Sequence, residues 1–508
     1  MRTFTFKGLF LTAVFTLLGC LSIQAADDDL ITKQITIKLD EAGTLPDKIG
    51  SSEKYKITNL KIIGEINGTD WKMIREMAGR DYENNITAGK LSMLDLSEAK
   101  IVEGGDSYNI GTKDGQDVHN SYTSNDEIGE FAFYGCSGLT CLNLPASLTT
   151  IGNGAFYGCS GLTSLILPAG ITTIGTRAFQ NCTGLTSLTI PSSLTTIGER
   201  AFMLCSGLTS LTLPASLTTI GKRAFYGCSG LTSLNLPANL TTIGSSAFQG
   251  CSGLTSLNLP ASLTTIGRGA FYGCSGLTNL TLPAGITEIG GDAFCGCSGL
   301  TSLNLPAGIT EIGAYAFSGC SGLTSLTIPS SLTTIGGDAF YGCSGLKEVK
   351  FCINDNLDTY LTKGHPYIGV SCGINYYLND KEVTSIVIPS NVTSLGDYAF
   401  ERCTTLQSVY VSWSTPISAG KTFYKVDKKN CNLYVPQGTK QDYFLANVWG
   451  DFGNIVEFDA TGIDKTTTST DVKEVSRYSV NGQRLVSPTK GLNIVKYSDG
   501  SVKKVAVE

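Results

Sequence analysis

The stretch GCSGLTSLNLPANLTTIGSSAFQ, residues 227–249, returns with few changes along most of this 508-residue chain. Its cysteine marks the period, because cysteines stand at a fixed interval of 23 residues from Cys136 to Cys343. A constant period of this length is typical of a repeat protein whose units stack. One unit is too small to bury its own apolar face, so neighbouring units must share a continuous core. The sequence therefore predicts a repeat solenoid.

Each repeat unit has a simple internal pattern. In the unit that begins at Leu231, leucines alternate with polar residues as in a short strand, and Pro237 ends that strand. A glycine then permits a tight turn, and an Ala-Phe pair packs inward through a short helical or irregular turn. We expect each unit to add one strand to a parallel β-sheet and one ring to an interior column that runs from Phe133 to Phe340.

The consensus LxxLxLPxxLTTIGxxAFxGCSG resembles the BspA-like leucine-rich repeats of bacterial surface proteins, over about residues 91–456. That resemblance implies a leucine-rich-repeat solenoid, exposed at the cell surface, that binds ligands and in some members acts as an adhesin for host matrix proteins. It implies no catalytic residues.

The N-terminus predicts export. Residues 1–26 have the features of a secretory signal peptide, because Arg2 and Lys7 precede a short apolar run and small residues follow it. An alternative is a lipoprotein signal in which Cys20 is the lipidated residue. No later segment is long and apolar enough to span a bilayer. We therefore expect a protein that is secreted or associated with the bacterial outer membrane.

The segments around the repeats are expected to close the ends of the solenoid. The predicted order is an N-terminal α/β cap (27–90), the solenoid (91–458) with insertions near 104–126 and 352–381 and a C-terminal cap, a linker (459–475) and a small β module (476–508). We expect helices at about Thr69–Ala78 and Lys440–Trp449, and a last solenoid strand at 433–435. After the second insertion the strand position is expected to return only at Val383.

The small C-terminal module contains two hairpin signals, Asn481-Gly482 and Asp499-Gly500, each between short strand patterns. Its endings resemble the C-terminal sorting domains of Bacteroidetes outer-membrane export, which implies delivery to the cell surface.

Seventeen cysteines in an exported chain would ordinarily indicate disulfides. Equivalent cysteines of stacked units, however, have parallel Cα–Cβ bonds, whereas a disulfide needs these bonds to face each other. We expect the repeated cysteines to be buried, reduced thiols. Cys352 and Cys372 do not follow the period, and the sequence leaves their pairing open.

Composition argues against several classes of function. The formal net charge is −6, which disfavours binding to nucleic acid through general basicity. The chain has two histidines, His119 and His365, with no metal-ligand or catalytic-triad spacing around them. We expect no catalysis, no cofactor and no metal.

Residues outside the core pattern form columns when the units stack. One column, just before the Ala-Phe pair, contains Arg177, Arg200 and Arg223 in three successive units; another, just after it, contains tyrosines including Tyr157, Tyr226 and Tyr272. These six residues are the candidate ligand contacts, since basic columns attract acidic ligands and exposed tyrosines anchor interfaces. A solvated charged ridge, with tyrosines that cover neighbouring coils, is the alternative.

A further column of Ser, Thr and Asn faces outward from the predicted sheet and could follow an extended glycan, or could simply keep the surface soluble. We therefore expect a monomeric cell-surface protein, an adhesin, that binds an extracellular protein through many weak contacts. The alternatives are a solenoid that binds glycan or mucin and a passive surface spacer.

Overall fold

The structure is a computed structural model that describes residues 29–110, 120–353, 357–365, 367–378 and 380–460, with five stretches of the C-terminal segment: 467–468, 474–479, 484–487, 490–497 and 502–507. The predicted signal peptide, with Cys20, and His119 lie outside the described residues. The chain divides into two compact units, residues 1–300 and residues 301–508.

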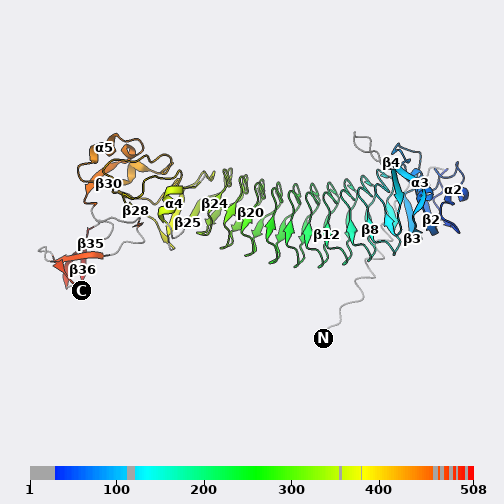
Figure 1. Ribbon diagram of the computed structural model, residues 1–508, viewed down its shortest axis with the longest axis horizontal. Helices are drawn as coiled ribbons and strands as arrows, with labels where there is room; N and C mark the ends of the chain where they lie inside the picture. Colours follow the sequence, from blue (N-terminus) through cyan, green and yellow to red (C-terminus); the bar gives the residue numbers. More distant parts are fainter. Residues whose placement is uncertain are drawn as a thin grey trace, which may run out of the picture. The chain divides into compact units, whose positions relative to one another are not determined.

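Repeat coils in the first unit carry two short strands each, where the sequence predicted one (Figure 1). The leucine strands are β7 (Cys141–Asn143), β9 (Ser164–Ile166), β11 (Ser187–Thr189), β13 (Ser210–Thr212), β15 (Ser233–Asn235), β17 (Ser256–Asn258) and β19 (Asn279–Thr281). The additional strands are β6 (Glu127–Ile128), β8 (Thr150–Ile151), β10 (Thr173–Ile174), β12 (Thr196–Ile197), β14 (Thr219–Ile220), β16 (Thr242–Ile243), β18 (Thr265–Ile266) and β20 (Glu288–Ile289).

Both sets of strands pair in parallel with a shift of one repeat, so that Leu234 lies opposite Leu257 and Thr242 opposite Thr265. The second set consists of a β-branched residue pair in most coils, and such residues favour the extended backbone of a strand. Two residues are too few to show an alternating pattern, which is why the sequence did not reveal these strands.

The phenylalanine column predicted from the repeat is confirmed within each unit. Neighbouring rings are stacked, with centroids 5.0 Å apart for Phe156 and Phe179 and 5.4 Å apart for Phe317 and Phe340. In the first unit every ring of the column is fully buried, and the contacts continue from coil to coil as far as Phe294. The rings therefore form the centre of the shared core.

The repeated cysteines are buried and, within the described residues, form no disulfide with one another, as predicted. From Cys159 to Cys297, each repeated thiol donates a hydrogen bond to the phenylalanine carbonyl of the preceding coil, at 3.1 Å for Cys228 to Phe202 and 3.2 Å for Cys251 to Phe225. The Cys136 thiol, in the first coil, lies 4.0 Å from the Tyr134 carbonyl instead. Burial raises the pKa of Cys136 to about 11, so this thiol is neutral at physiological pH. Cys352 and Cys372, whose pairing was open, are also free thiols.

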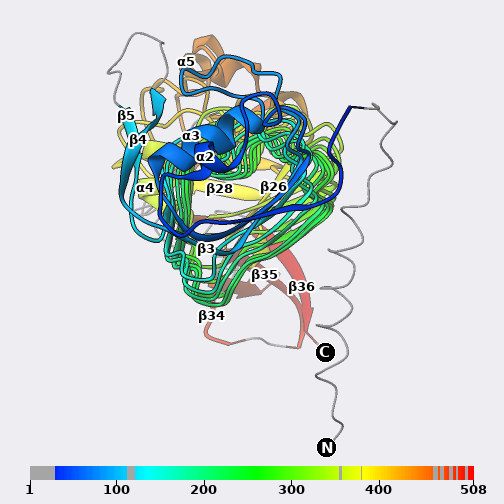
Figure 2. The same cartoon turned by 90° about the vertical axis from the view of Figure 1, so that its right-hand side faces the viewer.

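The N-terminal cap extends the leucine sheet through β1 (Ile35–Lys38), β2 (Asn59–Ile66) and β3 (Met93–Ile101), in the order β1-β2-β3-β7. Two helices, α2 (Leu45–Lys48) and α3 (Gly68–Met77), lie across the end of the coils (Figure 2). The Asn67 side chain caps α3, close to the predicted helix start. The first insertion is an antiparallel pair, β4 (Gly104–Ile110) and β5 (Asn120–Thr123).

Helix α3 covers Phe133, the first ring of the phenylalanine column. The Trp71 ring contacts Phe133 at 5.2 Å between centroids, and its indole nitrogen donates to the Ala132 carbonyl at 3.1 Å. The fully buried Arg75 also donates to Ala132, at 3.0 Å, and to the Phe131 carbonyl. The Ala132 carbonyl is thereby satisfied, as the equivalent Ala155 carbonyl is by Phe133 of its preceding coil.

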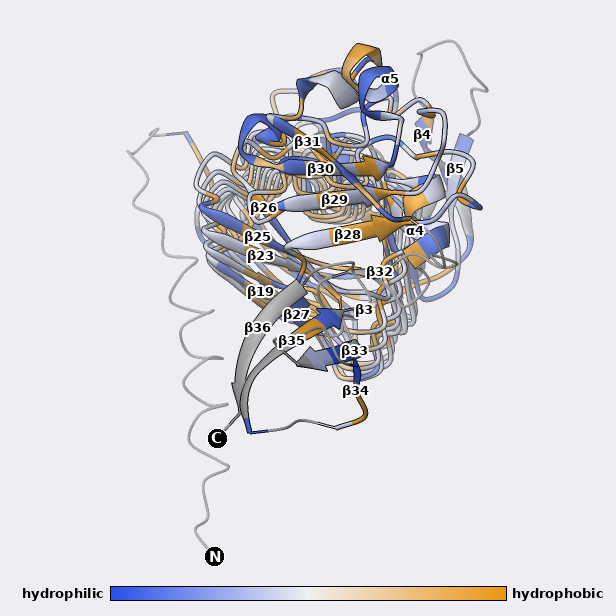
Figure 3. Cartoon of the chain, turned by 90° about the vertical axis from the view of Figure 1, so that its left-hand side faces the viewer, coloured by the Kyte–Doolittle hydropathy of each residue, from blue (hydrophilic) through white to orange (hydrophobic). Residues whose placement is uncertain are grey.

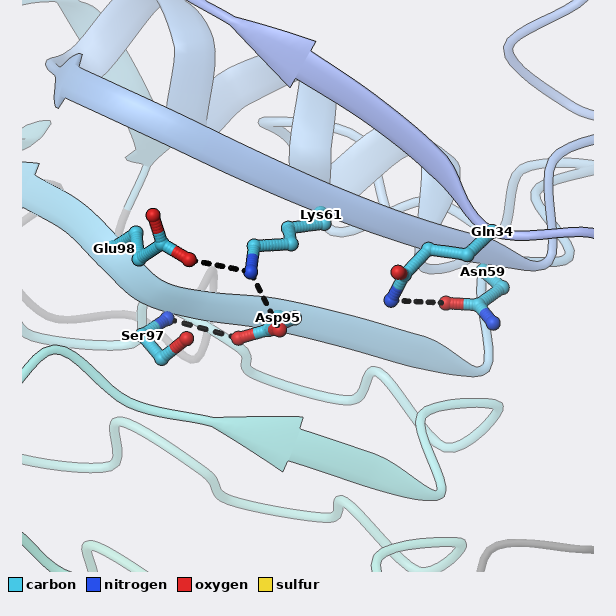
Figure 4. A network of polar contacts seen from close by, with 6 residues as sticks. All are labelled: Gln34, Asn59, Lys61, Asp95, Ser97 and Glu98. Atoms are coloured by element: carbon cyan, nitrogen blue, oxygen red, sulfur yellow. Dashed lines mark hydrogen bonds and ion pairs between the residues drawn. The ribbon is translucent and has the colours of Figure 1, made fainter.

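A polar network lies on one face of the cap strands (Figure 4). The Lys61 ammonium is 2.6 Å from a Glu98 carboxylate oxygen and 3.8 Å from Asp95, and Asp95 also accepts from the Ser97 backbone. The hydrogen bond to Glu98 raises the pKa of Lys61. The charges pair with one another, so this network stabilises the cap surface and leaves no unpaired cation for a ligand.

In the second unit, repeat coils contribute β21 (Ser302–Asn304), β22 (Glu311–Ile312), β23 (Ser325–Ile328), β24 (Thr334–Ile335) and β25 (Glu348–Cys352). The second insertion contains α4 (Leu357–Lys363), β26 (Ile374–Leu378) and β27 (Lys381–Glu382). Strand β26 pairs in parallel with β25, with Val349 opposite Ile374. The prediction that the strand position returns only at Val383 was wrong, because the insertion itself supplies the next strand at an irregular interval.

The end of the solenoid consists of β28 (Ser385–Ile388), β29 (Ser408–Val411), β30 (Asn432–Pro436) and β31 (Asn454–Phe458), with the 3-10 turn η1 (Lys428–Asn430). Strand β31 pairs with β30 and follows the strand predicted to be last. The closing helix is shorter than predicted: α5 (Lys440–Leu445) ends before the separate turn η2 (Trp449–Asp451). Helix α5 lies against β30 and β31 (Figure 3). Trp449 leaves the helix to become fully buried beside Phe423.

The predicted linker contains a short strand, β32 (Thr467–Thr468), which pairs antiparallel with β28. The C-terminal module is a four-stranded antiparallel sheet of β33 (Glu474–Ser479), β34 (Arg484–Leu485), β35 (Gly491–Tyr497) and β36 (Val502–Val507). Both predicted hairpin pairings are present, with Tyr478 opposite Arg484 and Val495 opposite Lys503. Their Asn-Gly and Asp-Gly turns lie outside the described residues.

Two positions in each coil adopt left-handed backbone conformations. One is the residue before the Ala-Phe pair, with φ of 55° at Ser246, and the other precedes the repeated cysteine, with φ of 71° at Gly227. Glycine takes most of the second positions, but Leu204 also adopts φ of 62° there. A non-glycine residue in the left-handed region raises the conformational free energy by about 1–2 kcal/mol, so the backbone at Leu204 is locally strained.

We predict that Phe225→Ala lowers the free energy of unfolding by about 3–5 kcal/mol, because it removes a fully buried ring from the column and leaves a cavity. Urea denaturation followed by circular dichroism measures the change. The control is Ser233→Ala on the exposed sheet face, expected to change stability by less than about 0.5 kcal/mol. A similar loss in both variants would contradict the importance of the column.

We also predict that Leu204→Gly raises stability by about 1 kcal/mol, because it relieves the left-handed strain. A Cβ at Gly227 would lie 2.6 Å from Leu204 Cδ2, so Gly227→Ala should destabilise the protein less when Leu204 is already glycine. A double-mutant cycle of unfolding free energies measures this coupling. Additive changes in the unfolding free energy would show that the side chains at positions 204 and 227 do not interact.

Candidate functional site

The three predicted arginines lie in consecutive coils at the left-handed position, with φ of 58°, 55° and 55° for Arg177, Arg200 and Arg223. Each backbone N–H donates to a carbonyl of the next coil, for example Arg223 to Ser245 at 3.0 Å. The backbone thus places the three side chains at equivalent positions of successive coils. The prediction that they form a column is confirmed, while their contact with a ligand stays a prediction.

The three side chains have different surroundings. Arg177 is exposed, and Arg200 is 3.5 Å from the carboxylate of Glu199, which offsets its charge. Arg223 is half-buried and makes no ion pair with the chain's described residues. Mutual repulsion within the column is therefore relieved at Arg200 but not at Arg223.

The tyrosine column is divided between packing and exposure. Tyr157 stacks on Tyr134, with ring centroids 5.0 Å apart, and its hydroxyl accepts from the Asn181 amide at 3.2 Å. Tyr226 is half-buried, whereas Tyr272 leaves 42% of its surface exposed. Tyr157 thus covers neighbouring coils, and Tyr272 is the predicted tyrosine most available to a ligand.

A hollow of about 410 Å³ brings two of the six predicted residues together. Its lining is Lys222, Arg223, Ser245, Ser246, Gln249, Arg268, Gly269, Tyr272 and Asp292. It excludes Arg177, Arg200, Tyr157 and Tyr226. The sequence prediction therefore identified one cation and one ring of this hollow and missed its small polar lining.

Changes in residue size along the left-handed column create the hollow. That position holds Arg223, Ser246, Gly269 and Asp292 in four successive coils. Ser246 and Gly269 are small, so the surface is recessed between the longer side chains of Arg223 and Asp292. A Cβ at Gly269 would lie 3.4 Å from Ser246 Oγ. A comparison of successive units along one column, rather than a search for a motif, could have revealed this feature from the sequence.

The hollow carries three cationic side chains and one carboxylate. Asp292 Oδ2 lies 3.0 Å from Arg268 Nε and 2.9 Å from Arg268 Nη2, so one charge of each sign is paired. Lys222 and Arg223 make no ion pair within the described residues. The remaining charge is about +2, which favours an anionic ligand.

Two other hollows lie in the N-terminal unit. One, of about 370 Å³, is lined in part by Lys54 and Glu76, whose side chains pair with each other at 2.6 Å. The other, of about 420 Å³, is lined largely by glycines and small polar residues with Arg80. Arg80 Nε donates to the Gly135 carbonyl at 3.1 Å, so its role is to join the cap to the first coil.

The sheet face combines structural and free hydroxyls. Threonines before each leucine strand donate to the backbone of the preceding coil, for example Thr186 to Thr163 at 3.0 Å. In contrast, the exposed hydroxyls of Ser187, Ser210 and Ser233 make no hydrogen bond with other described residues. The threonines stabilise the stack, and the serines are free to meet a ligand.

A comparison with known proteins shows the family. The chain matches the BspA type Leucine rich repeat region at residues 126–255, 241–365 and 372–444, more than half of its length. The chain belongs to this family. In the residues that the structure describes, no helix is long and apolar enough to cross a membrane.

Several solved structures are similar to parts of the chain. A leucine-rich repeat protein from Bacteroides ovatus is 24% identical, covers 70% of this chain and 94% of its own, and has a TM-score of 0.37. The leucine rich repeat protein of T. pallidum is 27% identical over 41% of this chain and 86% of its own, with a TM-score of 0.30. A leucine rich cell surface protein from Faecalibacterium prausnitzii is 23% identical over 67% and 86%, with a TM-score of 0.32. No curated protein matches the chain.

The second unit contains a buried carboxyl group that no predicted site uses. Glu401 is fully buried, with Arg402 Nε 3.8 Å away. Burial raises the pKa of Glu401 to about 7, although the Ile368 backbone, Arg402 and Lys425 oppose this shift. The backbone carbonyl of Glu401 accepts from Tyr376 Oη at 3.0 Å, which keeps the residue within a packed aromatic cluster.

We predict that Glu401→Gln removes a loss of stability that develops as the pH rises from acidic to neutral. The folded protein binds the Glu401 proton more tightly than the unfolded chain, so stability falls as the pH rises from about 4.5 through 7. The variant should match wild type near pH 4.5 and be about 3 kcal/mol more stable at pH 8. Urea denaturation at both pH values measures this difference. The exposed substitution Asp442→Asn is the control, and equal pH dependence of wild type and Glu401→Gln would contradict the shift.

Proposed function

We propose that this protein is a secreted, cell-surface binding protein that acts as an adhesin for host or neighbouring-cell macromolecules. The observation that carries the proposal is the repetition of surface columns in register, such as Arg177, Arg200 and Arg223 in three successive coils. A ligand with a repeated or extended surface can contact several such positions at once, so many weak contacts together give high avidity. Membership of the BspA-type family supports a protein ligand.

Export rests on the two ends of the chain. The signal-peptide pattern of residues 1–26 supports secretion, with Cys20 as the lipidated residue in the alternative form. The C-terminal hairpins support a sorting module that delivers the chain to the outer membrane. Acting as a monomer, the protein would present its coils to the outside.

A second candidate function is the binding of glycan or mucin along the sheet. The free, regularly spaced hydroxyls of Ser187, Ser210 and Ser233 favour it, because they could follow an extended sugar chain. A passive spacer that binds nothing specific is the remaining possibility.

Capture on protein and glycan arrays separates these functions. We expect the mature chain, residues 27–508, to capture protein ligands in a salt-sensitive manner. The triple variant Arg177→Ser, Arg200→Ser, Arg223→Ser should capture them at least about tenfold more weakly, which corresponds to about 1.4 kcal/mol. Replacement of Arg177, Arg200 and Arg223 by Lys, which keeps the three positive charges, serves as the matched control and should retain most of the capture.

Each other outcome contradicts the adhesin proposal in its own way. Capture that free sugars compete away would favour the glycan function. Silence on both arrays would favour the spacer.

A further inference from the structure

The hollow around Ser246 repeats the arrangement of an ion pair that the chain forms two coils later. Arg268 stands immediately before the left-handed position of its coil, and Asp292 occupies that position in the next coil. Their side chains pair at 2.9 and 3.0 Å. The equivalent residues two coils earlier are Lys222 and Ser246. Lys222 therefore has an alcohol at the place where Arg268 has a carboxylate.

The position left by the missing carboxylate is open. Ser246 and Gly269, the two successive residues of the left-handed column, are the smallest in that part of the column. Both line the hollow, with Lys222 and Arg223 at one side of it and Tyr272 and Asp292 at the other. A carboxylate that entered there would lie above Ser246 much as the Asp292 carboxylate lies beside Arg268.

The charges of the hollow favour this occupant. Arg268 is already paired with Asp292, and Arg200 outside the hollow is offset by Glu199. Lys222 and Arg223 make no ion pair with the described chain, so the two unpaired cations are adjacent in sequence and face one hollow. Like charges placed side by side repel each other, and an anion between them relieves that repulsion.

We propose that this hollow is an anion-binding subsite that takes the carboxylate of an acidic segment in a protein ligand, held by Lys222 and Arg223 above Ser246. The Arg268–Asp292 pair is the reason to favour a carboxylate. At the equivalent positions two coils later, two guanidinium nitrogens of Arg268 bind one carboxylate oxygen of Asp292. Ser246 Oγ and the Gln249 amide supply hydrogen bonds, and the exposed Tyr272 ring gives an apolar wall. This inference rests on the proposed protein-binding function and names the chemistry that the ligand must carry.

Two substitutions test the subsite with residues that the fold already accepts. Lys222→Ser with Arg223→Ser copies Ser245 and Ser246 of the next coil. Ser246→Asp places an acid where Asp292 and Asp338 stand in later coils, with φ of 57° and 55°. The new aspartate should pair with Lys222 and fill the hollow from within. Thermal melting by circular dichroism is expected to show that both variants remain folded.

The binding assay uses fluorescent hexaglutamate as the probe, with hexaglutamine as the uncharged comparison, at about 50 mM salt where charge screening is modest. We expect the double variant and Ser246→Asp each to weaken hexaglutamate binding at least about tenfold, or about 1.4 kcal/mol. Lys33→Ser removes one exposed positive charge from the N-terminal cap, away from the arginine column and the hollow, and should change binding less than about threefold. Hexaglutamine should bind no variant measurably.

Three results would overturn the subsite. They are hexaglutamate binding that Ser246→Asp leaves unchanged, an equal loss in Lys33→Ser, and binding of a heparin oligosaccharide where hexaglutamate does not bind, which would assign the hollow to a sulfated glycan. The proposed function fails separately, when the wild-type chain captures no protein on the array. If Ser246→Asp captured protein on the array as well as wild type does, the adhesin function would be retained and the hollow would play no part in it.

Discussion

Contact between one coil and the next is the constraint on which the rest of this structure depends. A single 23-residue unit has no interior of its own, so its phenylalanine, leucines and thiol are buried only by the coils on either side. The backbone is held in the same way: Phe225 donates to Ala247 of the next coil at 2.7 Å, and Arg223 to Ser245 at 3.0 Å. Stability is therefore a property of neighbouring pairs, and a cavity in one coil weakens two interfaces.

The same constraint explains why the ends differ from the repeats. At the first coil, Trp71 and Arg75 of α3 take the place of a preceding unit by covering Phe133 and donating to the Ala132 carbonyl. Arg75 is fully buried, and its guanidinium donates to carbonyl and amide oxygens rather than to a carboxylate. These hydrogen bonds to neutral oxygens stabilise its buried positive charge. At the other end Phe423 continues the column by stacking on Phe400, and Trp449, which has no counterpart in the repeats, covers Phe423.

Surface chemistry follows from the stack because the backbone repeats while the side chains vary. The left-handed position has nearly the same φ in arginine, serine, glycine and aspartate coils, so the residue type alone decides whether a given coil presents a cation, a gap or an acid. The order Arg223, Ser246, Gly269, Asp292 turns an otherwise uniform ridge into a charged hollow. The surface differences on which the proposed recognition rests are thus local departures from the consensus and not the consensus itself.

The repeat period by itself determined the solenoid, the phenylalanine column, the reduced thiols and the stacked arginines, because identical segments that share a core must place equivalent residues in register. Tertiary structure decided what depends on distance between different positions: the two-residue strands beside each turn, the strand β26 within the insertion, and the split of the tyrosines into a packed Tyr157 and an exposed Tyr272. It also decided that Arg223 and Tyr272 line one hollow while Arg177 and Tyr157 do not. The physical reason is that a column in the sequence specifies which residues are neighbours, whereas the size and pairing of those neighbours determine which of them a ligand can reach.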